Sequence, residues 1–197
     1  MPKLACKIPL KVALACSGGR DSMSALSFLL RGRRQVSLLH YNHGTPGSDE
    51  AEDFVSEAAK KEGLELLVGR PNKELESTEL AWRDARYDFF AGSDLPIVMA
   101  HHLNDAAEWW IFSSLRGRPN LMPITRLHEG VEILRPFMHF SRDQLLKQNV
   151  FGGFDDPSNS NLAYNRNRIR KNIIPEALKV NPGLLKTVSN MYMRNHD

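Results

Sequence analysis

A glycine-containing loop between an apolar run and an amphipathic run constrains the fold of this chain more than any other feature. The apolar run, Lys11 to Cys16, predicts a buried strand, and Asp21 to Leu30 predicts the helix after it. The loop between them reads Ser17-Gly18-Gly19-Arg20-Asp21-Ser22. Glycine lets the backbone approach a ligand closely, and a helix N-terminus offers unpaired N–H groups with partial positive charge. The segment therefore predicts a phosphate site, although an ordinary glycine-rich turn is the alternative.

Apolar and amphipathic runs then alternate along the chain. Strands are predicted at 35–40, 64–68, 95–100 and 131–134, and helices at 48–62, 77–90 and 103–115. Ser48 and Ser77 are predicted to cap the helices that they begin. This alternation is typical of βαβ units, so we expect an α/β fold with a parallel sheet and helices on both faces. Ligands bind such sheets at the carboxyl ends of the strands.

The end of the chain is predicted to be a short helical extension of the same structural unit. In this interpretation residues 1–140 form the sheet domain and 141–197 the extension, with helices at 141–147 and 183–193. Between them Tyr164 to Lys171 carries four cations in eight residues, and Pro175 is expected to close this basic segment. Such a segment suits the phosphates of ATP or of an RNA backbone, and an ordinary solvated basic helix is the competing interpretation.

Composition places the chain among globular, soluble proteins. Of its 197 residues, 42% are apolar and 25% are charged. Its two cysteines, Cys6 and Cys16, form no Cys-x-x-Cys pair, so neither a disulfide framework nor a zinc or iron–sulfur site is expected. The N-terminus lacks a long apolar stretch, so we expect a cytoplasmic protein without a membrane span. The formal net charge of +3 does not by itself imply nucleic acid.

Polar side chains follow two of the predicted strands where those strands end. Tyr41-Asn42-His43-Gly44 follows the second strand, and His101-His102 follows the fourth. Asp105 and Glu108 come next and are three residues apart, so both carboxylates lie on one helix face. Imidazole titrates near neutrality, so the histidines are candidate nucleotide contacts or bases. Each feature alone also fits a structural histidine or a solvated helix face, but their position beside the phosphate loop favours a site.

An ordered series of short blocks makes the interpretation more specific. The blocks are SGGRDS (17–22), NHG (42–44), ARY (85–87), AHHLNDAAE (100–108), LRG (115–117), LRPF (134–137), DPSN (156–159) and YNRNRIR (164–170). This series resembles the tRNA(Ile)-lysidine synthase family of PP-loop (N-type ATP pyrophosphatase) enzymes over residues 11 to 182. The first block is shared with PP-loop enzymes in general, whereas the last two single out this family. Asn104 departs from the pattern, because many relatives carry a second Asp there.

The resemblance implies an adenine nucleotide alpha hydrolase-like fold and an ATP- and Mg²⁺-dependent ligase. Such an enzyme attaches L-lysine to the wobble cytidine of tRNA(Ile) with a CAU anticodon. The cytidine C2 oxygen would attack the α-phosphate and release pyrophosphate, and the side-chain amine of lysine would then displace AMP. The resemblance assigns nucleotide binding to Ala15, Ser17, Gly18, Gly19, Arg20, Asp21, Ser22, Asn42, Met99 and Ala100.

The remaining roles also come from the resemblance. Asp21 would help to place Mg²⁺, Asp105 and Glu108 would hold the ammonium group of lysine, and a carboxylate or His101 would be the base. Either Arg168 or Arg116 would face the charge that develops on phosphate. The tRNA would be bound by Arg86, Arg116, Arg166, Arg168, Arg170 and Lys171.

Two other functions stay open at this point. One is a different PP-loop tRNA-modifying enzyme, such as a thiolase, although thiolases of this kind usually need cysteines at the site. The other is a non-catalytic module that binds tRNA or a nucleotide. Typical relatives continue into C-terminal domains that grip the tRNA, so we expect a minimal form that binds tRNA more weakly, or in which a host factor or a homodimer replaces that grip.

Overall fold

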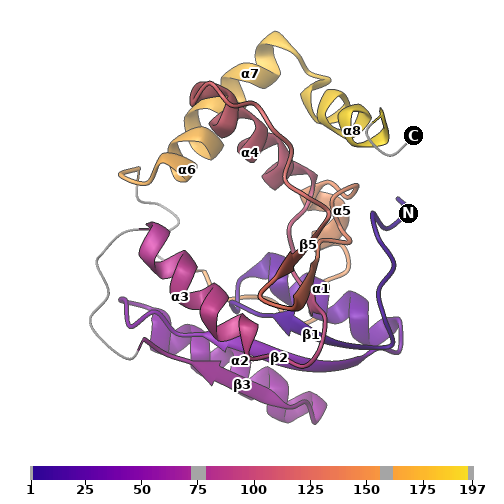
Figure 1. The fold of residues 1–197 in the computed structure, drawn as a ribbon, viewed down its shortest axis with the longest axis vertical. Helices are drawn as coiled ribbons and strands as arrows, with labels where there is room; N and C mark the ends of the chain where they lie inside the picture. The colour runs from indigo at the N-terminus through magenta and orange to yellow at the C-terminus, as the bar shows by residue number, and fades with distance from the viewer. Residues whose placement is uncertain (1, 72–78, 156–161, 195–197) are drawn as a thin grey trace.

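A six-stranded sheet forms the centre of the protein in the computed structural model, which describes residues 2–71, 79–155 and 162–194 (Figure 1). Its order is β3-β2-β1-β4-β6-β5. The strands are β1 (Lys11–Ala15), β2 (Gln35–Tyr41), β3 (Leu66–Gly69), β4 (Ile97–Val98), β5 (Thr125–His128) and β6 (Val131–Leu134). Neighbouring strands are parallel except β5, which pairs antiparallel with β6. The predicted α/β class is confirmed, whereas the antiparallel edge strand was not predicted.

The helices follow the predicted alternation. They are α1 (Arg20–Arg31), α2 (Ser48–Glu62), α3 (Glu79–Ala91), α4 (Leu103–Leu115), α5 (Arg142–Leu146), α6 (Asn165–Arg168), α7 (Ile174–Val180) and α8 (Leu184–Arg194), with a π-helical turn, η2 (Ile169–Ile173), between α6 and α7. Within the described residues, no helix combines the length and the apolar character that a membrane span needs.

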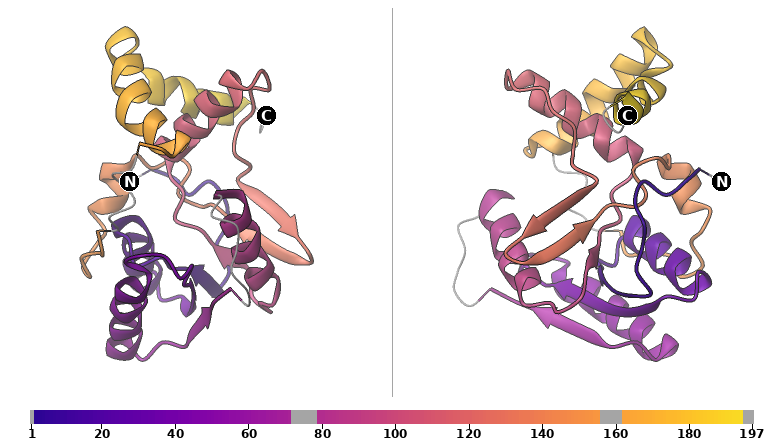
Figure 2. Two further views of the ribbon diagram at one scale, coloured as in Figure 1. Left: turned by 90° about the vertical axis from the view of Figure 1, so that its left-hand side faces the viewer. Right: turned by 45° about the vertical axis from the view of Figure 1, so that its right-hand side comes forward.

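Strand β1 shows why helices cover both faces of the sheet. Side chains along a strand point alternately to opposite faces. Val12 and Leu14 therefore pack in one apolar cluster with α1 and α2, whereas Ala13 packs in a second cluster with Tyr87 and Phe90 of α3. Figure 2 shows α3 on the face opposite α1 and α2.

A third apolar cluster attaches the C-terminal helices. Leu103 and Ala107 of α4 pack with Val188 and Tyr192 of α8, and the Tyr192 hydroxyl donates to the Met122 carbonyl at 2.8 Å. Helices α6, α7 and α8 accordingly gather around α4 at one end of the molecule (Figure 1). The predicted helical extension is confirmed, and it lies over the edge of the sheet where β1 and β4 end.

Details at two helix boundaries differ from the sequence-based expectation, and a third boundary is not described. Pro175 does not close the basic segment but lies in the first turn of α7, where a residue without an N–H and with fixed φ is tolerated. Ser48 is the first residue of α2, and Gly47 occupies the cap position before it. The Ser48 hydroxyl accepts from the Thr45 N–H at 3.1 Å instead of capping the helix. The predicted cap at Ser77 lies outside the described residues.

Candidate active site

The phosphate loop joins β1 to α1 with a geometry that suits an anion. Helix α1 starts at Arg20, and no described side chain caps its first N–H groups, which stay available to a ligand. Gly18 has φ +79°, a conformation that favours glycine. A Cβ added at Gly18 would lie 3.2 Å from the Ala51 carbonyl oxygen of α2. The loop is therefore held tightly between two helices.

Residues 148–155, which we call the strap, run along α1 to the phosphate loop. Arg31 donates to the Gln148 side chain at 2.8 Å near one end of α1, and the Phe154 N–H donates to the Gly18 carbonyl at 2.9 Å at the other. At Gly153 an added Cβ would lie only 2.7 Å from the backbone nitrogen of Arg20. The strap thus supports the loop from outside at a position where the backbones nearly touch.

A cavity of about 360 Å³ opens beside the phosphate loop at the carboxyl edge of the sheet. Its lining includes these predicted nucleotide-binding residues: Ala15, Ser17, Asp21, Ser22, Met99 and Ala100. The other predicted nucleotide-binding residues, Gly18, Gly19, Arg20 and Asn42, are not among its lining residues. Asn42 points to α2 instead, where its amide donates to Asp49 and Glu52 at 2.8 Å each, so it shapes the loop after β2.

His40 lines the same cavity and was missed by the sequence analysis. It lies at the buried end of β2, and its Nδ1 is 2.8 Å from the Cys16 carbonyl oxygen, which makes Nδ1 the donor. Burial lowers the pKa of His40, so the imidazole is neutral and its Nε2 is an acceptor. Nε2 is buried and has no hydrogen-bond partner among the described residues. A histidine inside an apolar strand usually indicates a core residue. The one sequence signal for a ligand contact at His40 was its position near the carboxyl end of the strand.

His102 joins the two carboxylates that the sequence placed at separate strand ends. Its Nε2 is 3.6 Å from Asp21 and its Nδ1 is 3.3 Å from Asp105. Burial opposes a charge on His102, but the carboxylates of Asp105 and Asp21 outweigh it and raise the pKa. Burial likewise opposes ionisation of Asp21, but His102 and Arg142 lower its pKa to about 2. His102 therefore connects the carboxylate of the phosphate loop with the carboxylate at the start of α4.

Two arginines of the basic segment reach across to the carboxylates of α4. Arg170 donates to both oxygens of Glu108, at 2.6 and 2.9 Å, and lies 3.4 Å from Asp105. Arg166 approaches the same carboxylates at 3.8 and 3.9 Å. Burial opposes the charge of Arg170, but Glu108 and Asp105 raise its pKa. Because η2 begins at Ile169, Arg170 projects from a π-helical turn, a feature frequent at functional sites.

His101 behaves differently from its neighbour. Its Nδ1 accepts a hydrogen bond from Arg135 at 3.2 Å, which leaves the proton of the neutral ring on Nε2. Burial lowers the pKa of His101 to about 3, although the nearby Asp105 opposes this shift. At neutral pH this residue is therefore a hydrogen-bond donor toward the cavity, which suits holding a substrate oxygen better than removing a proton.

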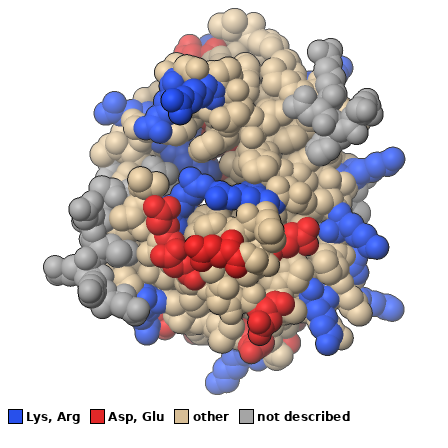
Figure 3. Space-filling model, viewed as in Figure 1, with Lys and Arg blue, Asp and Glu red and all other residues tan. Residues whose placement is uncertain are grey.

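A second cavity of about 310 Å³ adjoins the first. The two share four lining residues, His43, Arg86, His101 and Arg166. The second cavity is lined by aromatic rings and by arginines, which are Trp82, Tyr87, Trp109, Phe112, Arg83, Arg86, Arg126, Arg135 and Arg166. Figure 3 shows Lys and Arg side chains across the middle of this face beside a hollow. Aromatic and guanidinium planes together suit an unpaired nucleobase and its phosphates.

Three of the predicted tRNA-binding residues line neither cavity and form no ion pair with Asp105 or Glu108 among the described residues. The Arg168 guanidinium donates to the Leu162 carbonyl at 2.6 Å and is exposed. Arg116 is exposed after α4 and lies over the Phe112 ring at 4.6 Å. Lys171 is exposed as well. The structure therefore brings Asp21, Asp105, Glu108, His101, Arg86, Arg166 and Arg170 together, and leaves these three at the surface.

Comparison with known proteins agrees with this architecture. The model of the PP-loop domain family matches residues 5–177. The curated tRNA(Ile)-lysidine synthase of Lactococcus lactis is 32% identical over 195 residues, covering 92% of this chain and 45% of that protein. The tRNA(Ile)-lysidine synthase of Streptococcus thermophilus is 35% identical over 187 residues, covering 87% of this chain and 43% of that protein. The chain thus spans about half the length of the curated relatives that it matches.

A solved structure shows the same fold. The U34-tRNA thiolase NcsA from Methanococcus maripaludis, determined with its [4Fe-4S] cluster, superimposes with a TM-score of 0.72. The match covers 95% of this chain and 73% of that chain at 16% sequence identity. The family model, the relatives and the site geometry lead to one conclusion. The chain belongs to the PP-loop domain family.

Proposed function

We propose that the protein uses ATP to attach lysine to C2 of the wobble cytidine of tRNA(Ile) with a CAU anticodon. The observation that carries this proposal is the pair of adjoining cavities that share His43, Arg86, His101 and Arg166. One contains the phosphate loop, and the other is lined by aromatic rings and arginines. ATP and a nucleobase can therefore lie side by side. The names of the curated relatives support the choice of reaction.

In the first step the cytidine C2 oxygen attacks the α-phosphate of ATP. An oxygen–phosphorus bond forms, the bond to the β-phosphate breaks, and pyrophosphate leaves. The N–H groups of α1 would hold the phosphates. Mg²⁺ bound with ATP would neutralise phosphate charge, and the Asp21 carboxylate is suited to be one of its ligands. The low pKa keeps Asp21 ionised, and its hydrogen bond and ion pair with described residues both involve Oδ1, which leaves Oδ2 available.

In the second step the amine of lysine attacks C2. A carbon–nitrogen bond forms, the bond from C2 to its oxygen breaks, and AMP leaves with that oxygen. We assign the ammonium site to Asp105 and Glu108, where the ammonium group would displace the guanidinium groups of Arg166 and Arg170 that now contact these carboxylates. The amine must lose a proton before it attacks. We assign that proton to one of these carboxylates, because the His101 Nδ1 already accepts from Arg135.

Sulfur transfer, as in the named thiolase, is the main alternative. Reactive cysteines need an accessible thiolate with a lowered pKa. Cys16 lines the first cavity, but burial raises the pKa of its thiol. Burial also raises the pKa of Cys6, which lines neither cavity. These positions disfavour sulfur chemistry and support ligation.

The test uses the purified chain with ATP, Mg²⁺, radiolabelled lysine and unmodified tRNA(Ile) with a CAU anticodon. We expect label in the tRNA, and none in the same tRNA when uridine replaces the wobble cytidine. The variant Asp21→Asn should bind tRNA but incorporate no lysine, because the charge at the phosphate loop is lost. Absence of label from the wild-type protein with tRNA bound would instead favour the non-catalytic module.

A further inference from the structure

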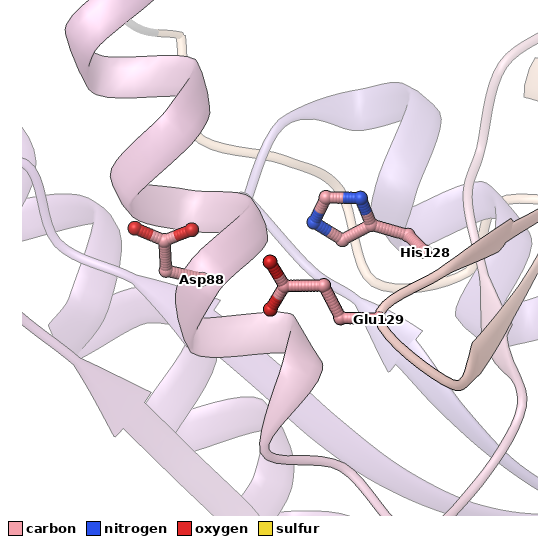
Figure 4. A group of neighbouring side chains, drawn as sticks. All are labelled: Asp88, His128 and Glu129. Carbon is pink, nitrogen blue, oxygen red and sulfur yellow. The ribbon is translucent and has the colours of Figure 1, made fainter.

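A group of three side chains lies outside both cavities, where α3 meets the turn between β5 and β6 (Figure 4). We call Asp88, His128 and Glu129 the hairpin cluster. Asp88 comes from α3, His128 ends β5, and Glu129 lies in the turn. One potential ligand atom from each residue lies within 4.8 Å of those of the other two. Helix α3 and the hairpin thus bring Asp88 close to His128 and Glu129, which are far from it in the sequence.

One potential ligand atom of the hairpin cluster lacks a hydrogen-bond partner within the described part of the chain, in a half-buried imidazole whose ring packs against the Tyr87 ring at 5.2 Å. The Nε2 of His128 is buried and makes no hydrogen bond there. The ligand atoms of the three residues lie within 4.8 Å of one another. Figure 4 shows one ring nitrogen of His128 facing both Asp88 and Glu129. A buried nitrogen without a partner calls for an explanation, and an ion between it and the carboxylates supplies one.

We propose that the hairpin cluster binds one divalent transition-metal ion, with Zn²⁺ as the favoured ion. Zn²⁺ accepts imidazole nitrogen and carboxylate oxygen together at 2.0 to about 2.2 Å. Mg²⁺ and Ca²⁺ favour oxygen ligands alone, so the imidazole selects against them. Donor atoms within 4.8 Å of one another can close around such an ion by small rotations, because Asp88 and Glu129 are exposed. Water would complete the coordination.

Two arginines lie close to the proposed site. Arg83 and Arg126 line a hollow together with Asp84, Asp88 and His128. Both guanidiniums lie over the Tyr87 ring, at 5.4 and 6.0 Å from its centroid. Their charge opposes a second cation, so the site should bind more weakly than a closed structural zinc site.

The position of the hairpin cluster gives the ion a mechanical role. Helix α3 supplies Trp82, Arg86 and Tyr87 to the second cavity, and the segment that enters the hairpin supplies Pro123 and Arg126. An ion held by Asp88 on one side and by His128 and Glu129 on the other would connect these two walls from outside. Binding would therefore restrain the cavity wall without contributing to the chemistry inside it.

The test is calorimetric titration of the untagged chain with Zn²⁺ in excess Mg²⁺, which occupies oxygen-only sites. We expect one saturable site. His128→Gln should weaken it at least tenfold, and Asp88→Asn should also weaken it. The control Glu132→Gln removes an exposed carboxylate from the same hairpin and should bind as the wild type does. Zn²⁺ should also slow hydrogen exchange in residues 79–91 and 125–131.

These outcomes do not depend on the proposed ligase function, because binding and exchange are measured without tRNA. Matching circular dichroism of the His128→Gln and wild-type proteins without Zn²⁺ would show that the variant folds. If that variant then binds Zn²⁺ as tightly as the wild type, the hairpin cluster is not the site. Absence of saturable binding to the wild-type chain would equally overturn the proposal.

Discussion

Side-chain neighbours shift the pKa values of two adjacent histidines in opposite directions. His102 lies between two carboxylates that raise its pKa, whereas burial lowers the pKa of His101 to about 3 and Arg135 occupies its Nδ1. The sequence places them side by side, and the resemblance named His101 as a possible base. Identical residues one position apart differ only in what surrounds them. In the structure His102 links Asp21 to Asp105, and His101 faces the shared wall of the cavities.

The first prediction concerns the titration of this pair. In NMR titrations His101 should stay neutral until the pH approaches about 3, and His102 should stay charged above the ordinary histidine range. The raised pKa of His102 contributes stability that is complete below the unfolded pKa and is lost as the pH rises through the folded pKa. In His102→Gln this alkaline loss of stability should therefore disappear. If the variant loses stability at alkaline pH as the wild type does, the pKa of His102 is not raised in the folded protein.

The second prediction concerns the contact between Glu108 and Arg170. Glu108→Gln keeps the shape of the side chain but leaves the guanidinium without its bidentate partner. Glu108 is 3% exposed, whereas the Arg170 side chain is 42% exposed. Water can therefore replace part of the hydrogen bonding that the guanidinium loses. We expect chemical denaturation to show a fall of about 1–3 kcal/mol in the free energy of unfolding. The control Glu176→Gln breaks an exposed pair with Lys179 and should change little. Equal effects in both variants would contradict the assignment.

At the scale of elements, α1 and the strap form the support of the phosphate loop. Hydrogen bonds connect them from Gln148 to Phe154, and Arg142 at the start of α5 donates to Asp21 at 3.1 Å. Asn104 of α4 accepts from the Arg142 N–H at 2.8 Å, so this departure from the family pattern joins α4 to α5. Segments more than a hundred residues apart thus fix one loop.

The third prediction compares two adjacent glycines of the strap. Gly153→Ala places a methyl group against the Arg20 backbone and should displace the phosphate loop, so ATP binding should weaken more than tenfold. Gly152→Ala is the control, because φ is +80° but nothing lies within 4 Å of an added Cβ. It should lower the melting temperature through backbone strain yet leave ATP affinity near that of the wild type. If both variants bind ATP equally well, the strap does not position the loop.

For the whole molecule, alternation of strand and helix patterns was enough to predict the fold. Gly63, for example, ends α2 with φ +65°, as its position after the amphipathic run indicated. Strand β5 escaped prediction because it is an exposed edge strand, with Leu127 72% exposed, and lacks an apolar alternation. The strand-end rule also anticipated that Asp21 and Asp105 lie close together.

Other parts of the site depend on tertiary packing and could not be predicted. Arg170 meets Glu108 across 62 positions of sequence, and only the packing of α4 against η2 and α8 brings them together. The basic segment was predicted to contact phosphates, yet two of its arginines pair with carboxylates. A run of cations in the sequence does not show which of them face the site and which face solvent.

The fourth prediction belongs to the whole surface. Binding of tRNA should weaken steeply as salt rises, because Arg and Lys contacts release counterions from phosphate. Lys171 is exposed at the surface in the same basic segment as Arg166 and Arg170, so Lys171→Gln should lower the slope of log K against log salt by about one phosphate contact. Lys186→Gln on α8 serves as a charge-matched control. A response that is flat in salt would remove the basic segment from the tRNA interface.

The most direct test of the central claim is mass spectrometry of the wobble nucleoside after incubation of tRNA(Ile) with the protein, ATP, Mg²⁺ and lysine. Because the cytidine oxygen leaves with AMP, the account predicts that this cytidine gains lysine with loss of one water, and that other cytidines are unchanged. An unmodified wobble nucleoside under conditions where the tRNA is bound, or sulfur in place of oxygen when a sulfur donor is added, would contradict it.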